Sequence, residues 1–443
     1  SNSGDYTSSA NIKGYWRFGE NTGTKAHDLS GSGNHGTISG AAYGSPGADA
    51  AGPTVSSVSS TTADGTYNIG DVLAITVTFN EVVTVSGTPQ LTLETGSADA
   101  VVDYASGTGS TTLTFNYTIA SGATSSDMDY TSTTALALNS GTIVDASGNA
   151  ATLTLAAPGA SNSLGANKAL VIEGAPPTVS SVTATTANGS FKAGSVVAIT
   201  ITFSEVVTVT GTPQLTLETG STDAVVNYAS GSGGATLTFN YTVAAGQNSS
   251  DLDYGSTTAL ALNSGTIADA VGNNATLTLA APAATNSLGA NKALIIDTTV
   301  PTVSAVTATT ANGTSKLADA IAITVTFSEA VTVTGTPQLT LETGTTDAVV
   351  NYTSGSGGTT LTFNYTVAAG DTNSDLDYTS NSALALNSGT IADGAGNAAT
   401  LTLAAPGASN SLGANKALVV DGIVPTVSSV TATTADGGYK VGG

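Results

Sequence analysis

A long internal repeat constrains this chain more than any other feature of its sequence. The segment Pro-Thr-Val-Ser recurs every 124 residues, and no insertion or deletion separates the copies. The four copies begin at Pro53, Pro177, Pro301 and Pro425. Self-similarity at a fixed period is typical of chains built from repeated units of one fold. The period predicts module 1 at 53–176, module 2 at 177–300, module 3 at 301–424 and the start of a fourth module at 425–443, after a different segment at 1–52.

Within each module, apolar residues alternate with polar ones. Leu73, Ile75, Val77 and Phe79 fall on one side of an extended segment, and residues between them fall on the other. This period of two predicts strands with one face in a core, and turn-forming stretches such as 86–89 separate them. No helical periodicity is found. About seven to nine strands per module, rich in Thr and Val, predict an all-β fold of tandem immunoglobulin-like β-sandwiches in a linear array.

The charge composition excludes several classes of partner. Asp and Glu total 31 and Lys and Arg total 9, so the formal net charge is -22. Such a chain has no basic patch for phosphates, and we expect no nucleic-acid binding. No apolar run approaches the ~18 residues that span a bilayer, so we expect no membrane insertion in this segment. Because the chain starts without a signal peptide and stops within a repeat, we expect it to be a piece of a longer protein.

Catalysis is not expected from the residue types present. The chain has no Cys, and its two histidines, His27 and His35, lie outside the repeats. Serine and cysteine triads and zinc sites therefore lack their parts in the modules. The alternative is a hydrolase that uses Asp127 and Asp129 as acid and base. That pair recurs in all three modules without Trp or an aromatic-rich cleft, so we expect a protein that is not an enzyme.

Seven acidic positions recur in every module, although each module has only one or two lysines. Salt bridges cannot neutralise most of these carboxylates, so a cation is their expected partner. Calcium fits because it takes about six to eight oxygen ligands and needs neither His nor Cys. The predicted calcium ligands are Glu81, Asp127, Asp129, Asp145, Glu173, Glu205, Asp251, Asp253, Asp269, Asp297, Glu329, Asp375, Asp377, Asp393 and Asp421.

Local patterns support this cation prediction. Asp375 and Asp377 fall on the same side of an extended segment, and 393–397 is an oxygen-rich turn. A carboxylate stands four residues before three of the repeated prolines, at Glu173, Asp297 and Asp421, where ligands from adjacent modules would meet. The alternative is that acidic residues keep the protein soluble, block edge-to-edge strand pairing or form turns. We favour that alternative for Glu94, Asp99 and their repeats.

Several of these segments resemble a known group of modules. The run 323–331, the turn 335–337 and the 393–397 turn are similar to bacterial immunoglobulin-like, cadherin-like tandem repeats of giant surface proteins, and the resemblance covers 53–443. It implies a β-sandwich in the stalk of a secreted adhesin, a surface layer or an extracellular filament at the cell surface. It also implies calcium between domains.

The segment before the repeats differs in character. Residues 14–20 and 28–37 are similar to the opening of a laminin-G-like, concanavalin A-like jelly roll, a family whose members often bind sugars. Only its first strands are expected within 1–52. Trp16 is expected in a core rather than against a sugar ring, and His27 and His35 are expected in turns.

The leading hypothesis from these patterns is a structural, non-catalytic shaft. Its expected partners are further repeats of the same chain or neighbouring copies of the protein. The alternative is an adhesive module that binds carbohydrate or cells through the 1–52 segment or the repeat loops. A third possibility is that 425–443 adds a strand to another subunit.

Overall fold

The computed structural model describes residues 51–435 without a break, together with 25, 26, 28, 32–37, 437, 438, 441 and 442. Trp16, His27 and the segment 14–20 lie outside the described residues. A short pair, β1 (Lys25–Ala26) and β2 (Gly36–Thr37), is antiparallel, and His35 precedes β2. Residues 425–435 form no strand, and Val427 and Val430 there are 82% and 90% exposed.

Module 3 shows how the alternating sequence becomes a sandwich. Its elements are β23 (Val303–Ala308), β24 (Gly313–Lys316), β25 (Ala320–Thr334), β26 (Gln338–Leu341), β27 (Ala348–Ser354), β28 (Gly358–Thr366), β29 (Thr372–Asn373), β30 (Leu384–Ala385), β31 (Thr390–Ala392), α3 (Leu412–Asn415) and β32 (Leu418–Asp421). In one sheet the neighbouring strands are hydrogen-bonded in the order β23-β25-β28-β27-β26-β30, and β31 pairs with β25. A second sheet has the order β24-β32-β29.

Modules 1 and 2 repeat most of these elements. Module 1 has β3 (Val55–Ser60), β4 (Gly65–Tyr67), β5 (Val72–Ser86), β6 (Gln90–Leu93), β7 (Ala100–Ser106), β8 (Ser110–Thr118), β9 (Thr124–Ser125), β10 (Leu136–Ala137), β11 (Thr142–Val144), α1 (Leu164–Asn167) and β12 (Leu170–Glu173). Module 2 has β13 (Val179–Ala184), β14 (Gly189–Phe191), β15 (Val196–Thr210), β16 (Gln214–Glu218), β17 (Ala224–Ser230), β18 (Gly234–Thr242), β19 (Asp253–Tyr254), β20 (Leu260–Ala261), β21 (Thr266–Ala268), α2 (Leu288–Asn291) and β22 (Leu294–Ile296). Strand β19 of module 2 corresponds to 377–378 of module 3 and not to β29.

Two strands of each module change their pairing partner along their length. In module 3, β25 pairs with β28 up to Thr326, shifts register before Val331, and then pairs with β31. Strand β27 pairs with β26 through its first half and with β28 through its second half. Such bulges bend a strand and increase its twist. Each of these strands is therefore paired with one neighbour near its start and with another near its end, and the bend between them curves the sheet around the core.

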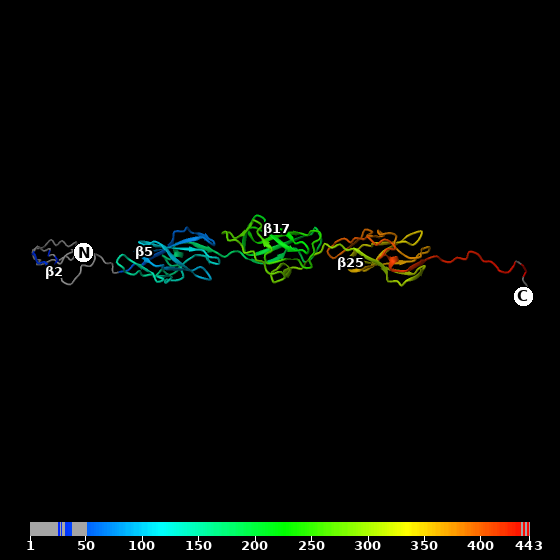
Figure 1. Cartoon of the computed structure of the whole chain (residues 1–443), viewed down its shortest axis with the longest axis horizontal. Helices are drawn as coiled ribbons and strands as arrows, with labels where there is room; N and C mark the ends of the chain where they lie inside the picture. Colours follow the sequence, from blue (N-terminus) through cyan, green and yellow to red (C-terminus); the bar gives the residue numbers. More distant parts are fainter. Residues whose placement is uncertain are drawn as a thin grey trace. The chain divides into compact units, whose positions relative to one another are not determined.

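Each module has its own hydrophobic core, and the predicted inward face forms it. Leu73, Ile75, Val77 and Phe79 are all 2% exposed or less. Three separate clusters of buried residues follow the repeat, one in each module. Figure 1 shows the strands grouped in the same way, with β5, β17 and β25 in different groups. The fold is therefore all-β, with three repeated immunoglobulin-like β-sandwiches, as the sequence predicted.

The short helices were not expected from the sequence. Each spans four residues and begins after a buried serine; the Ser411 side chain accepts a hydrogen bond from the Ala414 N–H. A segment of four residues is too short to display helical periodicity, so no pattern marks it. No helix among the described residues is long and apolar enough to cross a membrane.

Backbone contacts divide the chain into two compact units. The first contains residues 1–176 together with 268–274, and the second contains 177–267 together with 275–443. The second unit thus holds two of the three cores. The turn at 268–274 is separated from its own repeat in this division because it bonds residues of the preceding repeat, among them Asn68 and Glu173.

Candidate metal centre

Three of the predicted ligands converge in the second unit. Asp297 follows β22, Glu329 lies in β25 and Asp393 follows β31. One carboxylate oxygen from each residue lies within 4.8 Å of the other two. Asp297 belongs to repeat 177–300, and Glu329 and Asp393 belong to repeat 301–424, so the cluster joins ligands from two repeats.

The turn after β31 holds Asp393 in place. Its Oδ1 accepts hydrogen bonds from the backbone N–H groups of Ala395 at 2.9 Å and Asn397 at 2.8 Å. The Asn397 side-chain amide donates to the other oxygen, Oδ2, at 2.8 Å. Asp favours such turns because its short side chain can accept hydrogen bonds from backbone N–H groups a few residues further along the chain. Asp393 is only 6% exposed, so the turn holds one buried carboxylate of the cluster in place.

Glu329 supplies the least satisfied oxygen of the cluster. Its Oε1 is buried and has no hydrogen-bond partner among the described residues. Burial raises the pKa of Glu329 above its usual value of 4.5, and the neighbouring charges of Asp297 and Asp393 raise this pKa further. A buried, unpaired carboxylate oxygen facing two other carboxylates is costly unless a cation or a proton compensates it.

The donor set fits a hard divalent cation. All three side chains offer oxygen, and neither nitrogen nor sulfur ligands take part. Calcium binds such oxygens with flexible geometry and completes its shell with carbonyls or water. Asp297, Glu329 and Asp393 thus place three carboxylate oxygens close enough together for one ion to contact, and calcium binding there stays a prediction.

The equivalent turns in the other modules have the same internal bonds. Asp145 Oδ1 accepts from the N–H groups of Ser147 and Asn149, both at 2.8 Å. Asp269 Oδ1 accepts from Gly272 at 2.7 Å and from Asn273 at 2.8 Å. Glu81 and Glu205 hold the place of Glu329 in their repeats.

A further carboxylate of this series was missed in the sequence. Asp49 stands four residues before Pro53, the place held by Asp297 before Pro301. It lies outside the described residues, but the 124-residue period alone identifies it.

The paired aspartates are placed differently from the cluster. Asp377 accepts hydrogen bonds from the backbone N–H groups of Tyr378 and Gly407, each at 2.9 Å. A Cβ at Gly413 would lie 3.0 Å from Asp377 Oδ2, so the start of α3 packs closely on this carboxylate. Asp129 and Asp253 bind the corresponding loop N–H groups of Gly159 and Ala283. These aspartates tether a loop to the sheet.

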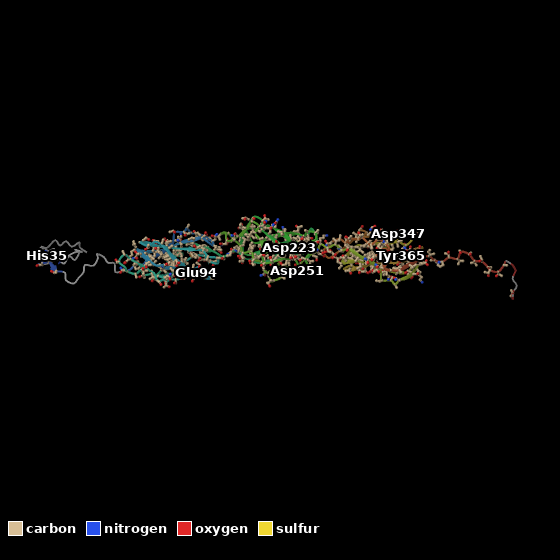
Figure 2. All side chains as sticks on the ribbon, viewed as in Figure 1. His35, Glu94, Asp223, Asp251, Asp347 and Tyr365 are labelled. Carbon is tan, nitrogen blue, oxygen red and sulfur yellow. The ribbon has the colours of Figure 1, made fainter. Side chains whose placement is uncertain are left out.

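Among the residues that the structure describes, the remaining predicted ligands are not brought into a group of three. Asp127, Asp251, Asp375 and Asp421 are exposed, and Glu173 is half-buried. Figure 2 shows exposed carboxylates of modules 1, 2 and 3, among them Glu94, Asp223, Asp251 and Asp347. His35, also labelled there, accepts a hydrogen bond at Nδ1 from the Asp28 N–H at 3.0 Å.

Comparisons with known proteins add little to this geometry. No family model and no curated protein matches the chain. Among solved structures, the I-band fragment I67-I69 from titin is similar with 8% identity and a TM-score of 0.28, over 85% of this chain and 99% of that one. A membrane-anchored protein from Corynebacterium diphtheriae is similar with 9% identity and a TM-score of 0.18, over 82% and 98%. Neither match carries an argument about what the chain does.

Proposed function

We propose that this chain is the structural, non-catalytic shaft of a secreted bacterial cell-surface adhesin or extracellular filament. Calcium between its modules stiffens the shaft. The carboxylate cluster of Asp297, Glu329 and Asp393 is the observation that carries the proposal, because its ligands come from two successive repeats. A cation there links the end of one module to the next, so that bending the junction requires breaking metal–oxygen contacts.

The repeat supports the mechanical part of the proposal. Identical spacing gives every module the same ends, so the same junction can be made again at each boundary. Each module also has a separate core, which lets it resist unfolding by itself. A shaft needs both properties, and its partners are further repeats of the chain or neighbouring copies.

Calcium titration of the full chain tests the proposal. We expect heat of binding in calorimetry and, by small-angle scattering, a larger maximum dimension in calcium than in chelator. At free calcium of about a hundred times Kd, binding to the native state alone would stabilise it by about 2.7 kcal/mol. Glu329→Gln should weaken binding and reduce the rise in Tm, whereas Glu342→Gln, the same change at an exposed position, should not. An unchanged Tm and dimension with and without calcium would show that the stiffening is wrong.

A carbohydrate-binding function is the second candidate, and a polar groove favours it. In module 3 a hollow of about 550 Å³ is lined by Asp347, Asn351 and Asn364 among others. A similar hollow of about 600 Å³ lies beside Asp223, Asn227 and Asn240 of module 2. Amides and carboxylates at an open groove are groups that can bond sugar hydroxyls. A glycan array probed with the full chain tests this function, and Asn364→Ala should reduce any signal.

A further inference from the structure

Beside the carboxylate cluster lies a set of polar contacts that needs no ion. The side chain of Asn397 is only 8% exposed, and its Nδ2 donates two hydrogen bonds. One reaches Asp393 Oδ2 in its own repeat at 2.8 Å. The other reaches the backbone carbonyl of Asp297, which lies in the preceding repeat, also at 2.8 Å. Both protons of this amide are therefore used, one on each side of a module boundary.

The same contact occurs one repeat earlier. Asn273 is 4% exposed, and its Nδ2 donates to Asp269 Oδ2 at 2.7 Å and to the backbone carbonyl of Glu173 at 2.6 Å. These residues all belong to the first unit, which takes in the turn 268–274. Two occurrences of a buried amide with the same pair of acceptors show that the contact is a repeated feature of the fold.

A second group from the preceding repeat seats the turn as well. Asn68 Nδ2 donates to the Val271 carbonyl at 2.6 Å, and the Ile69 N–H donates to Asn273 Oδ1 at 3.1 Å. In the second unit, Lys192, which holds the place of Asn68, donates from Nζ to the Gly396 carbonyl at 2.8 Å. The turn is thus bonded to two separate segments of the repeat before it.

We infer that Asn397 is a positioning residue that clamps module 3 to the backbone of module 2, and Asn273 makes the same pair of bonds within the first unit. The clamp orders the junction before any cation binds, and a cation then closes a preformed set of ligands. The first half of this inference stands without the proposed function, and the second half rests on it. The physical reason is that the buried Asn397 amide loses its water on docking and is stable there only while both of its protons are bonded.

The chain suits a direct test because it has no native Cys. Spin labels on Thr208→Cys and Thr332→Cys place one probe on β15 and one on β25, at exposed equivalent positions of the two repeats. Double electron–electron resonance then gives the distribution of distances between the labels. In chelator, we expect a narrow distribution for the parent chain and a clearly broader one for Asn397→Ala.

Asn415→Ala is the matched control. Its Nδ2 also donates to a backbone carbonyl at 2.8 Å, but that carbonyl belongs to Val306 in the same module. The control should lower the Tm without broadening the distance distribution. If Asn397→Ala folds poorly, Lys192→Ala removes an exposed contact of the same junction, and Lys316→Ala is its equivalent one repeat later. Of these two lysine variants, Lys192→Ala should broaden the distance distribution and Lys316→Ala should leave it unchanged.

Calorimetry separates the two halves of the inference. Mutation of a group that hydrogen-bonds a metal ligand typically lowers metal affinity by about 10- to 100-fold, so Asn397→Ala should weaken calcium binding by about that factor. Absence of calcium binding in the parent chain would remove the proposed cation but leave the clamp result in chelator intact. The clamp itself is wrong if the parent chain and Asn397→Ala give distance distributions of the same width in chelator, whether both are broad or both are narrow.

Discussion

Single residues of the same type have different roles in this chain, and their surroundings decide which. Asp393 binds its own turn beside two other carboxylates, whereas Asp377 holds a loop through two backbone N–H groups. The sequence identified both as candidate ligands because both recur in every module. Recurrence cannot separate a ligand from a tether, since both are needed in every copy of the fold.

Substitution of Asp377 separates these two roles. Asp377→Ala removes the acceptor of the Gly407 N–H, and because Gly407 is exposed and water can replace that acceptor, we expect the loss of a typical net hydrogen bond, about 0.5–1.5 kcal/mol. Asp375→Ala, two residues away and exposed, should change stability by less than about 0.5 kcal/mol. Urea unfolding gives both values. Calcium binding lost in Asp375→Ala would instead support the prediction that this pair ligates calcium.

The role of the clamp amide, like the carboxylate of Asp49, was missed by sequence reasoning. Asn397 was placed in an oxygen-rich turn, but its partner is a backbone carbonyl of another repeat. A carbonyl has no residue type, so no sequence pattern can point to it. The recurrence of Asn149, Asn273 and Asn397 at the period of the repeat was the available signal.

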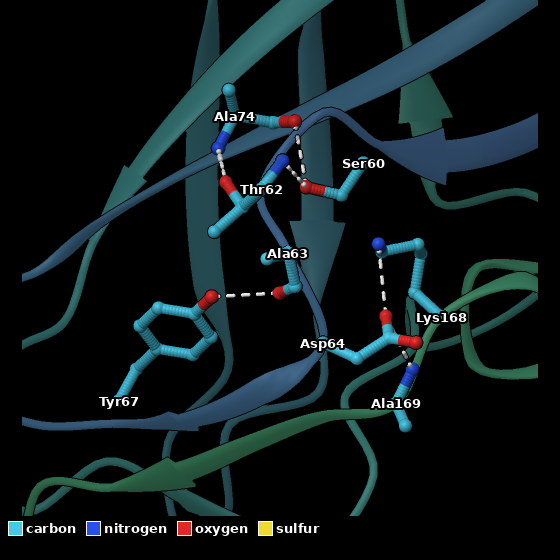
Figure 3. A network of polar contacts seen from close by, with 8 residues as sticks. All are labelled: Ser60, Thr62, Ala63, Asp64, Tyr67, Ala74, Lys168 and Ala169. Atoms are coloured by element: carbon cyan, nitrogen blue, oxygen red, sulfur yellow. Dashed lines mark hydrogen bonds and ion pairs between the residues drawn. The ribbon is translucent and has the colours of Figure 1, made fainter.

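A natural difference between the modules predicts a local pH effect. In module 1, Asp64 accepts from Lys168 Nζ at 2.8 Å, and this bond lowers the pKa of Asp64 (Figure 3). Modules 2 and 3 have Asn188 and Asn312 at this place, and these cannot titrate. Because the folded pKa lies below the unfolded one, the stabilisation is present above the usual value of 3.8 and is lost as pH falls through the folded pKa.

Hydrogen exchange can measure that effect inside one chain. The Gly65 N–H donates to the Ala169 carbonyl, and Gly189 and Gly313 make the equivalent bonds. On acidification, protection of Gly65 should fall relative to protection of Gly189 and Gly313. Equal changes at all three glycines would show that the Asp64–Lys168 pair does not stabilise this edge.

At the scale of the element, the alternating pattern predicted the strands but not their pairing. Leu339 and Leu341 are fully buried on β26, as their period of two requires. The bulge in β25 and the change of partner along β27 were not predictable, because alternation shows which face of a strand is buried but not which strand lies beside it. Thr76 is another exception: it was expected on the outer face but is only 8% exposed, since β5 lies between β3 and β8.

The short helix α3 gives an element-scale prediction. The Ser411 hydroxyl accepts from the Ala414 N–H at 3.2 Å, and Ser411 is fully buried. Ser411→Ala should destabilise module 3 by about 1 kcal/mol, typical for loss of an N-cap. Thermal melting measures the loss, and Ser411→Thr, which keeps the hydroxyl, should recover part of it. A neutral Ser411→Ala would mean that packing of Leu412 alone holds the helix.

At the scale of the whole molecule, three separate cores predict three unfolding events. Leu361 is fully buried in module 3, and Leu361→Ala should cost about 2–5 kcal/mol there. Because repeat proteins transmit stability mainly to neighbours, the core of module 1 should keep its stability. Single-molecule stretching should show three steps of similar length, with one weakened by the substitution. A single cooperative step would contradict independent cores.

The seating of the 268–274 turn among residues of the preceding repeat also bears on the order of folding. A nascent chain emerges from its N-terminus, and domains generally fold as units in that order. The segment that receives the turn is therefore synthesised, and able to fold, before the turn itself appears. Each folded repeat then offers hydrogen-bonding groups to one loop of the next repeat, which favours folding from the N-terminus toward the C-terminus.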